Sequence, residues 1–305
     1  MMGNQLALIK REIWEHRSIY ITPAAIAIVM LLLALTGQVA ISALGASVDL
    51  AMMGANELPP EAHKAMITGF VAGLGSIFVV AMWILTIFYS LDSLYAERKD
   101  KSILFWRSLP VTDAETVLSK LLVAIVVIPL VTFAAIAVTQ ILSLIFASIW
   151  LNAEGGNAGL LIWQALDLVD IWGGTLIFVL ALPIWLSPFV GWYLFVSAWA
   201  KRMPLLIAFL PLFVLPMIEK IVFGTAFLAS AFFERTASLP LFNIGDNTFA
   251  MFELEDMPFD ENMISLLGII DLGKFLSSLS LWAGLIVCGL FTTAAIYVRR
   301  YRDES

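Results

Sequence analysis

The sequence predicts an all-helical integral membrane protein that crosses the bilayer six times. Of its 305 residues, 61% are apolar and only 13% are charged, and the mean hydropathy is +0.95. A soluble domain is about 45–50% apolar and roughly 25% charged, so a soluble globule of this length could not bury the excess. The net charge of −7 argues against nucleic acid as the main partner. The single cysteine, Cys288, excludes an intrachain disulfide framework and a Cys-rich metal site.

Long runs without Asp, Glu, Lys or Arg locate the membrane spans. A spanning helix needs about 20 predominantly apolar residues. We expect one membrane domain, 1–305, whose spans cover about 19–44, 66–91, 119–150, 172–200, 203–220 and 275–298.

The basic residues predict how these spans are oriented. With six spans, 13 of the 17 Lys and Arg residues fall on the side that holds both termini and the second and fourth loops. Because cytoplasmic loops are enriched in Lys and Arg, we expect both termini to be cytoplasmic. Five or seven spans would scatter the basic clusters across both faces.

The fifth span is short and is interrupted by prolines. Pro204, Pro211 and Pro216 favour a kinked or broken helix over 203–220. The following apolar run, 221–233, is too short to span alone and is interpreted as a re-entrant or outer-leaflet helix. The alternative is one continuous helix of 31 residues that carries the Glu219–Lys220 pair in the middle of the membrane.

Two further segments lie outside the spans, one before the first span and one between the fifth and the sixth. Residues 4–17 place Leu6, Ile9, Ile13 and Trp14 on one helical face, which is typical of an amphipathic helix lying at the cytoplasmic membrane surface. Residues 234–274 are acidic with scattered apolar residues, and we expect them to form a small helical cap on the outer side before the last span.

The second cytoplasmic loop, residues 92–120, has three parts. Its charged beginning, 92–101, should extend the second span into the cytoplasm as a solvated helix. An apolar cluster at 103–106 lies outside the bilayer. Two interpretations fit it equally well: a segment that rests on lipid, and a docking surface for another protein. After Pro110, the residues Thr112 and Glu115 match a capping box that begins the third span.

The run from Glu97 to Leu122, E-R-x-D-x-S-I-L-F-W-R-S-L-P-V-T-D-x-E-x-V-L-S-K-L-L, resembles the same loop in ATP-binding-cassette (ABC) type-2 permeases. One departure is Lys101 before Ser102, where family members often have Gly-Thr or Gly-Ser. The resemblance implies a type V exporter-like fold with a cytoplasmic coupling helix over Ser102–Leu109. It also implies that the ATPase-coupling residues are Glu97, Arg98, Ser102, Ile103, Leu104, Phe105, Trp106, Arg107 and Leu109.

The same resemblance implies the partners. These are a separate ABC ATPase subunit, which would bind ATP and magnesium, and a second permease copy, either identical or similar. We expect membrane lipid as a further partner, and we place the chain in the cytoplasmic (inner) membrane of a bacterium. Small and aromatic residues of the second and fifth spans are candidates for a translocation pathway or a dimer seam, with helix packing or lipid contact as the simpler role; they are Gly69, Gly73, Phe78, Trp83, Phe209 and Phe213.

No catalytic role is expected for this chain. Residues 268–274 match G-x-x-x-x-G-K, but Phe275 stands where a phosphate-binding loop has Ser or Thr, and the segment lies on the outer side. We therefore predict no cofactor and no metal on the chain. The resemblance to type-2 permeases implies an exporter driven by its partner's ATP hydrolysis. The alternatives are a secondary transporter driven by an ion gradient and a membrane anchor or regulatory subunit that binds an ATPase without moving substrate.

Overall fold

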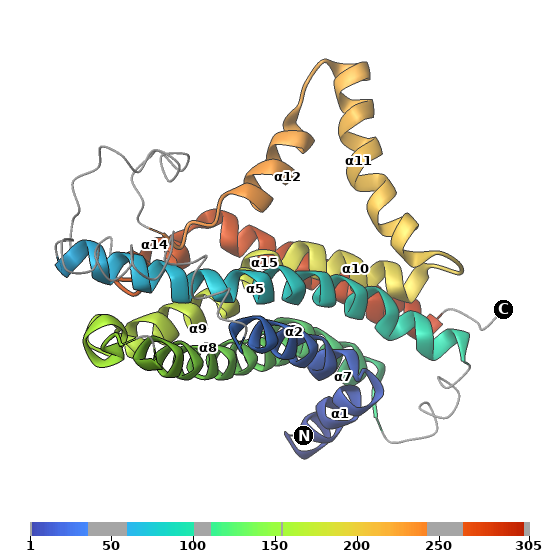
Figure 1. Ribbon diagram of the computed structural model, residues 1–305. Helices are drawn as coiled ribbons and strands as arrows, with labels where there is room; N and C mark the ends of the chain where they lie inside the picture. Colours follow the sequence, from blue (N-terminus) through green and yellow to red (C-terminus); the bar gives the residue numbers. More distant parts are fainter. Residues whose placement is uncertain (1, 36–59, 101–110, 154, 243–264, 302–305) are drawn as a thin grey trace.

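The computed structural model describes residues 2–35, 60–100, 111–153, 155–242 and 265–301 (Figure 1). Every regular element in these ranges is a helix, apart from one isolated bridge between Phe242 and Ile270. Six helical stretches are long and apolar enough to cross a membrane. Within these ranges the all-helical class is thus confirmed, and so is the presence of six candidate spans.

The elements before the middle of the chain are α1 (Met2–Glu15), α2 (Ser18–Leu35), α5 (Pro60–Lys99), α7 (Asp113–Leu122), the π-helical turn η1 (Val123–Val127) and α8 (Ile128–Ala153). The second half contains the π-helical turn η2 (Gly159–Trp163), α9 (Leu168–Trp185), α10 (Ser187–Trp199), α11 (Pro204–Phe223), α12 (Phe227–Ala237), α14 (Leu272–Ser277) and α15 (Leu279–Tyr301).

Two of the helices are much longer than a membrane crossing requires. The 40 residues of α5 span about 60 Å at 1.5 Å per residue, roughly twice the thickness of the hydrocarbon core. Helices α7 and α8 join through η1 into one stretch of 41 residues. Each stretch is therefore longer than one bilayer crossing requires, and each includes residues of the second loop, 92–99 in α5 and 113–120 in α7.

The π-helical turn η1 follows from the proline just after it. Pro129 has no N–H to donate to the carbonyl four residues earlier, and its ring crowds that carbonyl. A wider turn over Val123–Val127 relieves the clash without ending the helix.

The predicted fourth span, 172–200, is divided in two. Helix α9 ends at Trp185 and α10 begins at Ser187, with Leu186 outside the helical backbone region between them. Pro183 and Pro188 flank this break, and each removes a donor from the helical hydrogen-bond pattern. Helix α10 then packs closely along α15, where a Cβ on Gly191 would lie 3.0 Å from the Cα of Cys288.

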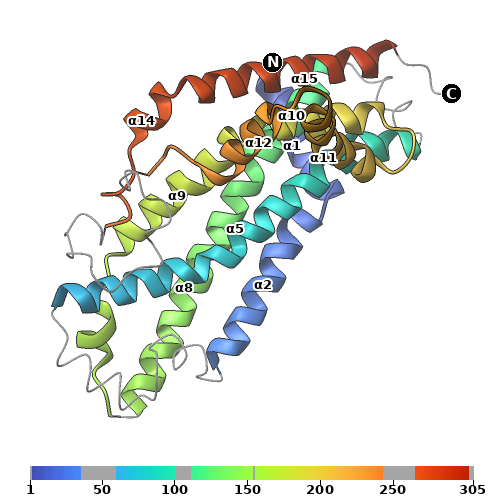
Figure 2. The same cartoon turned by 90° about the horizontal axis from the view of Figure 1, so that it is seen from above.

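The main core lies between α2, α5, α8, α9 and α10 (Figures 1 and 2). Its buried side chains include Phe78 of α5, Ile128 of α8 and Leu194 of α10. One polar residue helps to hold it: the Gln140 amide donates to the Val71 carbonyl at 2.8 Å and accepts from the Trp172 indole at 3.0 Å. Helices α5, α8 and α9 are thereby tied together.

Helices α11 and α12 form an arm, residues 204–237, that stands off the bundle (Figure 1). Helix α11 ends at Phe223, and Gly224 adopts a left-handed φ of 67° that glycine tolerates at a helix end. The chain reverses there, so the structure has two helices where the alternative prediction had one helix of 31 residues. The foot of the arm is fixed by Arg235, whose guanidinium lies 3.9 Å from the ring centre of Trp185 and donates to the Trp185 carbonyl.

Candidate functional site: a buried charge cluster at the root of the second loop

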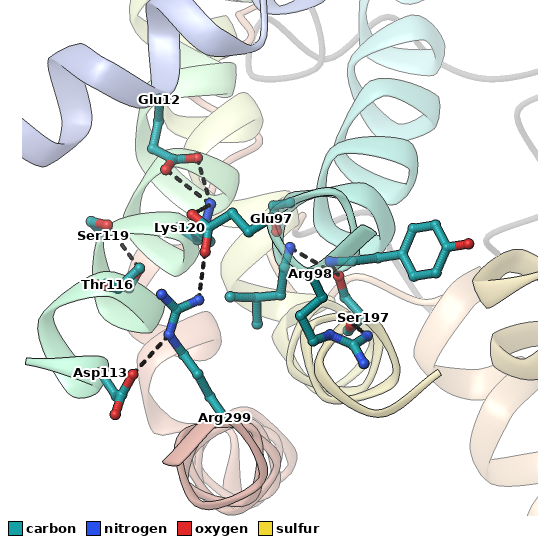
Figure 3. Close-up of polar contacts among 12 residues, drawn as sticks. Glu12, Glu97, Arg98, Asp113, Thr116, Ser119, Lys120, Ser197 and Arg299 are labelled. Atoms are coloured by element: carbon teal, nitrogen blue, oxygen red, sulfur yellow. Dashed lines mark hydrogen bonds and ion pairs between the residues drawn. The ribbon is translucent and has the colours of Figure 1, made fainter. Parts of the chain in front are cut away.

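Six charged side chains meet where α1, α5, α7 and α15 converge, and all of them except Arg11 are labelled in Figure 3. We call this group the charge cluster; its members are Arg11, Glu12, Glu97, Asp113, Lys120 and Arg299. Three acids face three bases, so the formal charge of the cluster is zero. Neutrality matters because a group of buried charges is tolerated only where its members compensate each other.

Lys120 of α7 lies at the centre of the charge cluster. Its side chain is fully buried, and its Nζ lies 2.9 and 3.0 Å from the two carboxylate oxygens of Glu12. The same nitrogen lies 3.1 Å from Oε1 of Glu97. One ammonium group therefore bridges the N-terminal helix α1 and the end of α5.

Glu97 connects α5 to α1 and α15. Its Oε1 accepts from Nη2 of Arg11 at 2.8 Å, and its Oε2 accepts from Nη1 of Arg299 on α15 at 2.5 Å. Arg299 in turn donates from Nε to Asp113 at 2.9 Å, at the first turn of α7. An acid in the first turn also suits the positive end of the helix dipole.

Arg98 turns away from the charge cluster and binds α10 instead. Its Nη2 donates to the carbonyls of Ser197 and Ala200 at 2.5 and 2.8 Å, where the last carbonyls of the helix lack partners within it. The Ser197 hydroxyl accepts from the backbone N–H groups of Leu94 and Tyr95 (Figure 3). Glu97 and Arg98 are adjacent in α5 but bind different helices: Glu97 binds α1, α7 and α15, whereas Arg98 binds the end of α10.

Tyr89 and His16 also contact the Glu12 carboxylate. The Tyr89 hydroxyl donates to Glu12 at 3.0 Å, and His16 Nε2 lies 3.8 Å from the same carboxylate oxygen. The His16 ring packs edge-on against Tyr89, with 4.9 Å between ring centres. Burial lowers the pKa of His16 below its ordinary value of 6.5, although Glu12 acts in the opposite direction.

The predicted capping box is confirmed, and it fixes the end of the loop. The Thr112 hydroxyl accepts from the Glu115 N–H at 3.2 Å, while the Glu115 carboxylate accepts from the Thr112 N–H at 2.9 Å. Helix α7 therefore begins firmly at Asp113, which is itself bound to Arg299. The other predicted ATPase-coupling residues, Ser102, Ile103, Leu104, Phe105, Trp106, Arg107 and Leu109, lie outside the described residues.

The charged beginning of the loop differs from its prediction as a solvated helix. Helix α5 does continue to Lys99, but Glu97 is only 1% exposed. On α1, similarly, Leu8 and Glu12 are buried, whereas Leu6 and Trp14 are exposed. The reason is the same in both places: each acid faces a lysine or arginine from another helix, and ion pairing offsets the cost of burial.

The candidate pathway and seam residues do not gather on one surface. Phe78 is buried in the core, Trp83 is half-buried against it, and Phe209 stacks on Tyr193 at 5.8 Å. Phe213 on the arm is 72% exposed. A Cβ at Gly69 or Gly73 would meet no atom within 4 Å, so neither glycine serves packing within the described part of the chain.

Sequence reasoning identified only Glu97 as a site residue and missed the other five members of the charge cluster: Arg11, Glu12, Asp113, Lys120 and Arg299. The available signal was weak, namely acids and bases in the charged segments next to the apolar runs. Within the described ranges, no three His, Cys, Asp or Glu side chains gather as metal ligands would. Comparisons of the chain with protein-family models, with curated proteins and with solved structures give no match.

Proposed function

We propose that this chain is the membrane-spanning permease subunit of an ABC exporter in a bacterial inner membrane. A separate ATPase subunit hydrolyses ATP and docks on the second loop, and a second permease copy completes the transport unit. The end of the bundle that holds the charge cluster faces the cytoplasm, together with both termini. Support comes from six candidate spans and from the resemblance of residues 97–122 to the coupling loop of type-2 permeases.

The observation that carries the proposal is that both ends of this loop enter the charge cluster. Glu97 lies just before the predicted coupling helix, Ser102–Leu109, and Asp113 lies just after it; Arg299 binds both of them. A displacement of the loop by a docked ATPase would therefore act on α5, α7 and α15 together. Packed helices joined in this way move as rigid bodies, as an alternating-access mechanism requires.

The ion pairs make this connection stiff and geometrically specific. Each charge of the cluster is held by at least one partner at 3.1 Å or less, and Glu12, Glu97 and Lys120 are at most 1% exposed. A small shift of one partner would leave a buried charge uncompensated. Helices α5, α7 and α15 should therefore move together and not slide past one another.

A transporter driven by an ion gradient, the first alternative, usually carries ionisable residues near the middle of its spans. The candidate here is Glu219 of α11, but its carboxylate accepts from the Thr225 hydroxyl at 2.6 Å and from the N–H groups of Phe227 and Leu228 at 2.8 Å. It thus caps α12 and holds the turn of the arm. A carboxylate engaged by three donors is poorly placed to exchange a proton with a substrate pathway, which favours the ATP-driven proposal.

A second permease copy has exposed surfaces available to it. From Phe213 to Phe223 the arm exposes large apolar side chains all around the helix, and only 6% of the membrane-spanning window of α11 is buried. The open glycines Gly69 and Gly73 would allow another helix to approach α5 closely. We assign the subunit seam to these surfaces as part of the same proposal.

The test is purification of the tagged permease from its own host, followed by measurement of Mg²⁺-dependent ATPase activity in the purified fraction. We expect the wild type to bring an ATPase with it and Phe105→Asp/Trp106→Asp to lose it, because two buried charges would oppose an apolar contact. Tyr301→Asp is the matched control, since Tyr301 is an exposed aromatic residue at the same end of the bundle. If the double variant retains and stimulates the ATPase, the docking assignment is wrong.

A further inference from the structure

The outward face of α1 is both apolar and basic. Leu6 and Trp14 are 69% and 67% exposed, and Lys10 and Arg17 are exposed beside them. Spacings of four residues place Leu6, Lys10 and Trp14 along one side of α1, and Arg17 lies in the connection just after the helix. The Lys10 ammonium lies 4.9 Å from the centre of the Trp14 ring, so the cation and the aromatic side chain occupy the same patch.

The acids of α1 do not neutralise this face. Glu12 points inward to the charge cluster, and Glu15 pairs with Arg11 at 3.1 Å. Among the described residues, no acid forms an ion pair with Lys10 or Arg17. The outward face therefore presents two positive charges on an apolar surface.

The position of α1 also suits the boundary of a membrane. Helix α1 is steeply inclined to α2, the first candidate span, which follows it after a two-residue connection (Figure 1). The first turn of α2 exposes Tyr20 and Ile21, so exposed apolar side chains also begin the candidate span that follows α1. Basic residues next to aromatic and aliphatic ones at this level are typical of a helix in the headgroup region.

We propose that the outward face of α1, formed by Leu6, Lys10 and Trp14 and extended by Arg17 just after the helix, binds the anionic headgroups of the adjacent leaflet and that Glu12 couples this binding to the charge cluster. The lipid contact stands independently of the permease assignment, whereas its influence on transport rests on that proposed function. Positive charge selects anionic lipid over neutral lipid, and Leu6 and Trp14 supply an apolar anchor.

The coupling follows from the two faces of one helix. Lys10 and Trp14 lie on the outward side of α1, and Glu12 lies between them in sequence on the inward side, where both its oxygens contact Lys120. Lipid that fixes the position of α1 therefore also fixes the position of Glu12, the carboxylate that pairs with Lys120. Because linkage is reciprocal, an intact charge cluster should in turn strengthen the lipid contact.

The size of the effect can be bounded. Each Lys or Arg near an anionic surface contributes about fivefold to binding, so two contribute about 30-fold at low ionic strength. The attraction between exposed charges is screened within about 3 Å at 1 M salt, so the preference should disappear there.

The experiment is hydrogen exchange of the purified chain in nanodiscs of phosphatidylcholine alone and of phosphatidylcholine with phosphatidylglycerol, without any ATPase. We expect exchange across α1 to be slower by up to about 30-fold in the anionic discs at low salt. Lys10→Gln/Arg17→Gln should abolish the difference, whereas Lys201→Gln/Arg202→Gln, a basic pair exposed at the same end of the bundle, should preserve it. Equal exchange in both lipids, or an equal loss in the control pair, would overturn the lipid assignment.

The coupling has its own readout in the same samples. Exchange across α7, which does not carry the lipid-facing residues, should also slow in anionic discs and should lose this response in Glu12→Gln. If α7 is unaffected while α1 responds, the coupling is overturned. Because no ATPase is present, these results are distinguishable from a failure of the permease assignment.

Discussion

Replacing Lys120 by methionine removes the central cation of the charge cluster while nearly preserving the side-chain volume. The side chain is fully buried, and its ammonium group contacts Glu12 at 2.9 and 3.0 Å and Glu97 at 3.1 Å. After the substitution, Glu97 keeps Arg11 and Arg299, but Glu12 keeps only the Tyr89 hydroxyl at 3.0 Å and more distant cations, with Arg11 at 4.0 Å. The cluster changes from neutral to a formal charge of −1.

The free energy of unfolding should fall by about 3–5 kcal/mol, because breaking a buried pair leaves an uncompensated charge. That loss corresponds to a change of at least about 100-fold in the folding equilibrium. The assay is reversible unfolding in mixed micelles with an increasing fraction of SDS, followed by helical circular dichroism. Lys201→Met is the matched control at an exposed lysine and should cost less than about 0.5 kcal/mol.

A double-mutant cycle with Glu12→Gln separates the ion pair from other effects. The double variant Glu12→Gln/Lys120→Met has a neutral cluster again, so it should be more stable than the sum of the single changes by about 1–3 kcal/mol. The reasoning is refuted if Lys120→Met unfolds within 1 kcal/mol of the wild type, or if the two changes are additive.

Three further substitutions test other contacts. Arg98→Ala should cost about 1.5–3 kcal/mol and speed hydrogen exchange at the end of α10, because two charged hydrogen bonds to its carbonyls are lost; unchanged exchange at Ala200 would contradict this. Glu219→Gln should weaken the cap of α12 by about 1 kcal/mol, or about fivefold in exchange at Leu228, whereas Lys220→Gln should match the wild type. Burial lowers the pKa of His16, so as the pH falls His16 is protonated in the unfolded chain before it is protonated in the folded chain. The free energy of unfolding should therefore fall as the pH drops from 7 to 5. His16→Asn should make that decline shallower in SDS titrations, and an equally steep decline would exclude a buried neutral histidine.

The helices and the local caps could be predicted from sequence because their causes are local. Charge-free runs identify the spans, since lipid excludes unpaired charge from a long stretch of chain. The capping box at Thr112 and Glu115 involves residues only three positions apart, and the structure confirms it. The break at Leu186 was missed, although Pro183 and Pro188 on either side were available as a signal.

The charge cluster could not be predicted because its contacts join distant parts of the chain. Lys120 and Glu12 are 108 residues apart, and Arg299 and Glu97 are 202 residues apart. Read locally, Lys120 and Arg299 border apolar runs, and Glu12 and Glu97 lie in charged segments, where a charged side chain ordinarily reaches water. Only the convergence of α1, α5, α7 and α15 shows that Glu12 and Glu97 are buried and paired.

The central claim, that an ATPase docks on the second loop, is tested most directly by cross-linking from that loop. Cys288 is the single cysteine of the chain and is buried, so Trp106→Cys supplies the one readily accessible thiol for a photo-activated cross-linker. After illumination in native membranes, mass spectrometry of the product should identify a polypeptide with a phosphate-binding Walker A sequence. Cross-links to lipid alone, or only to a second copy of this chain, would contradict the claim.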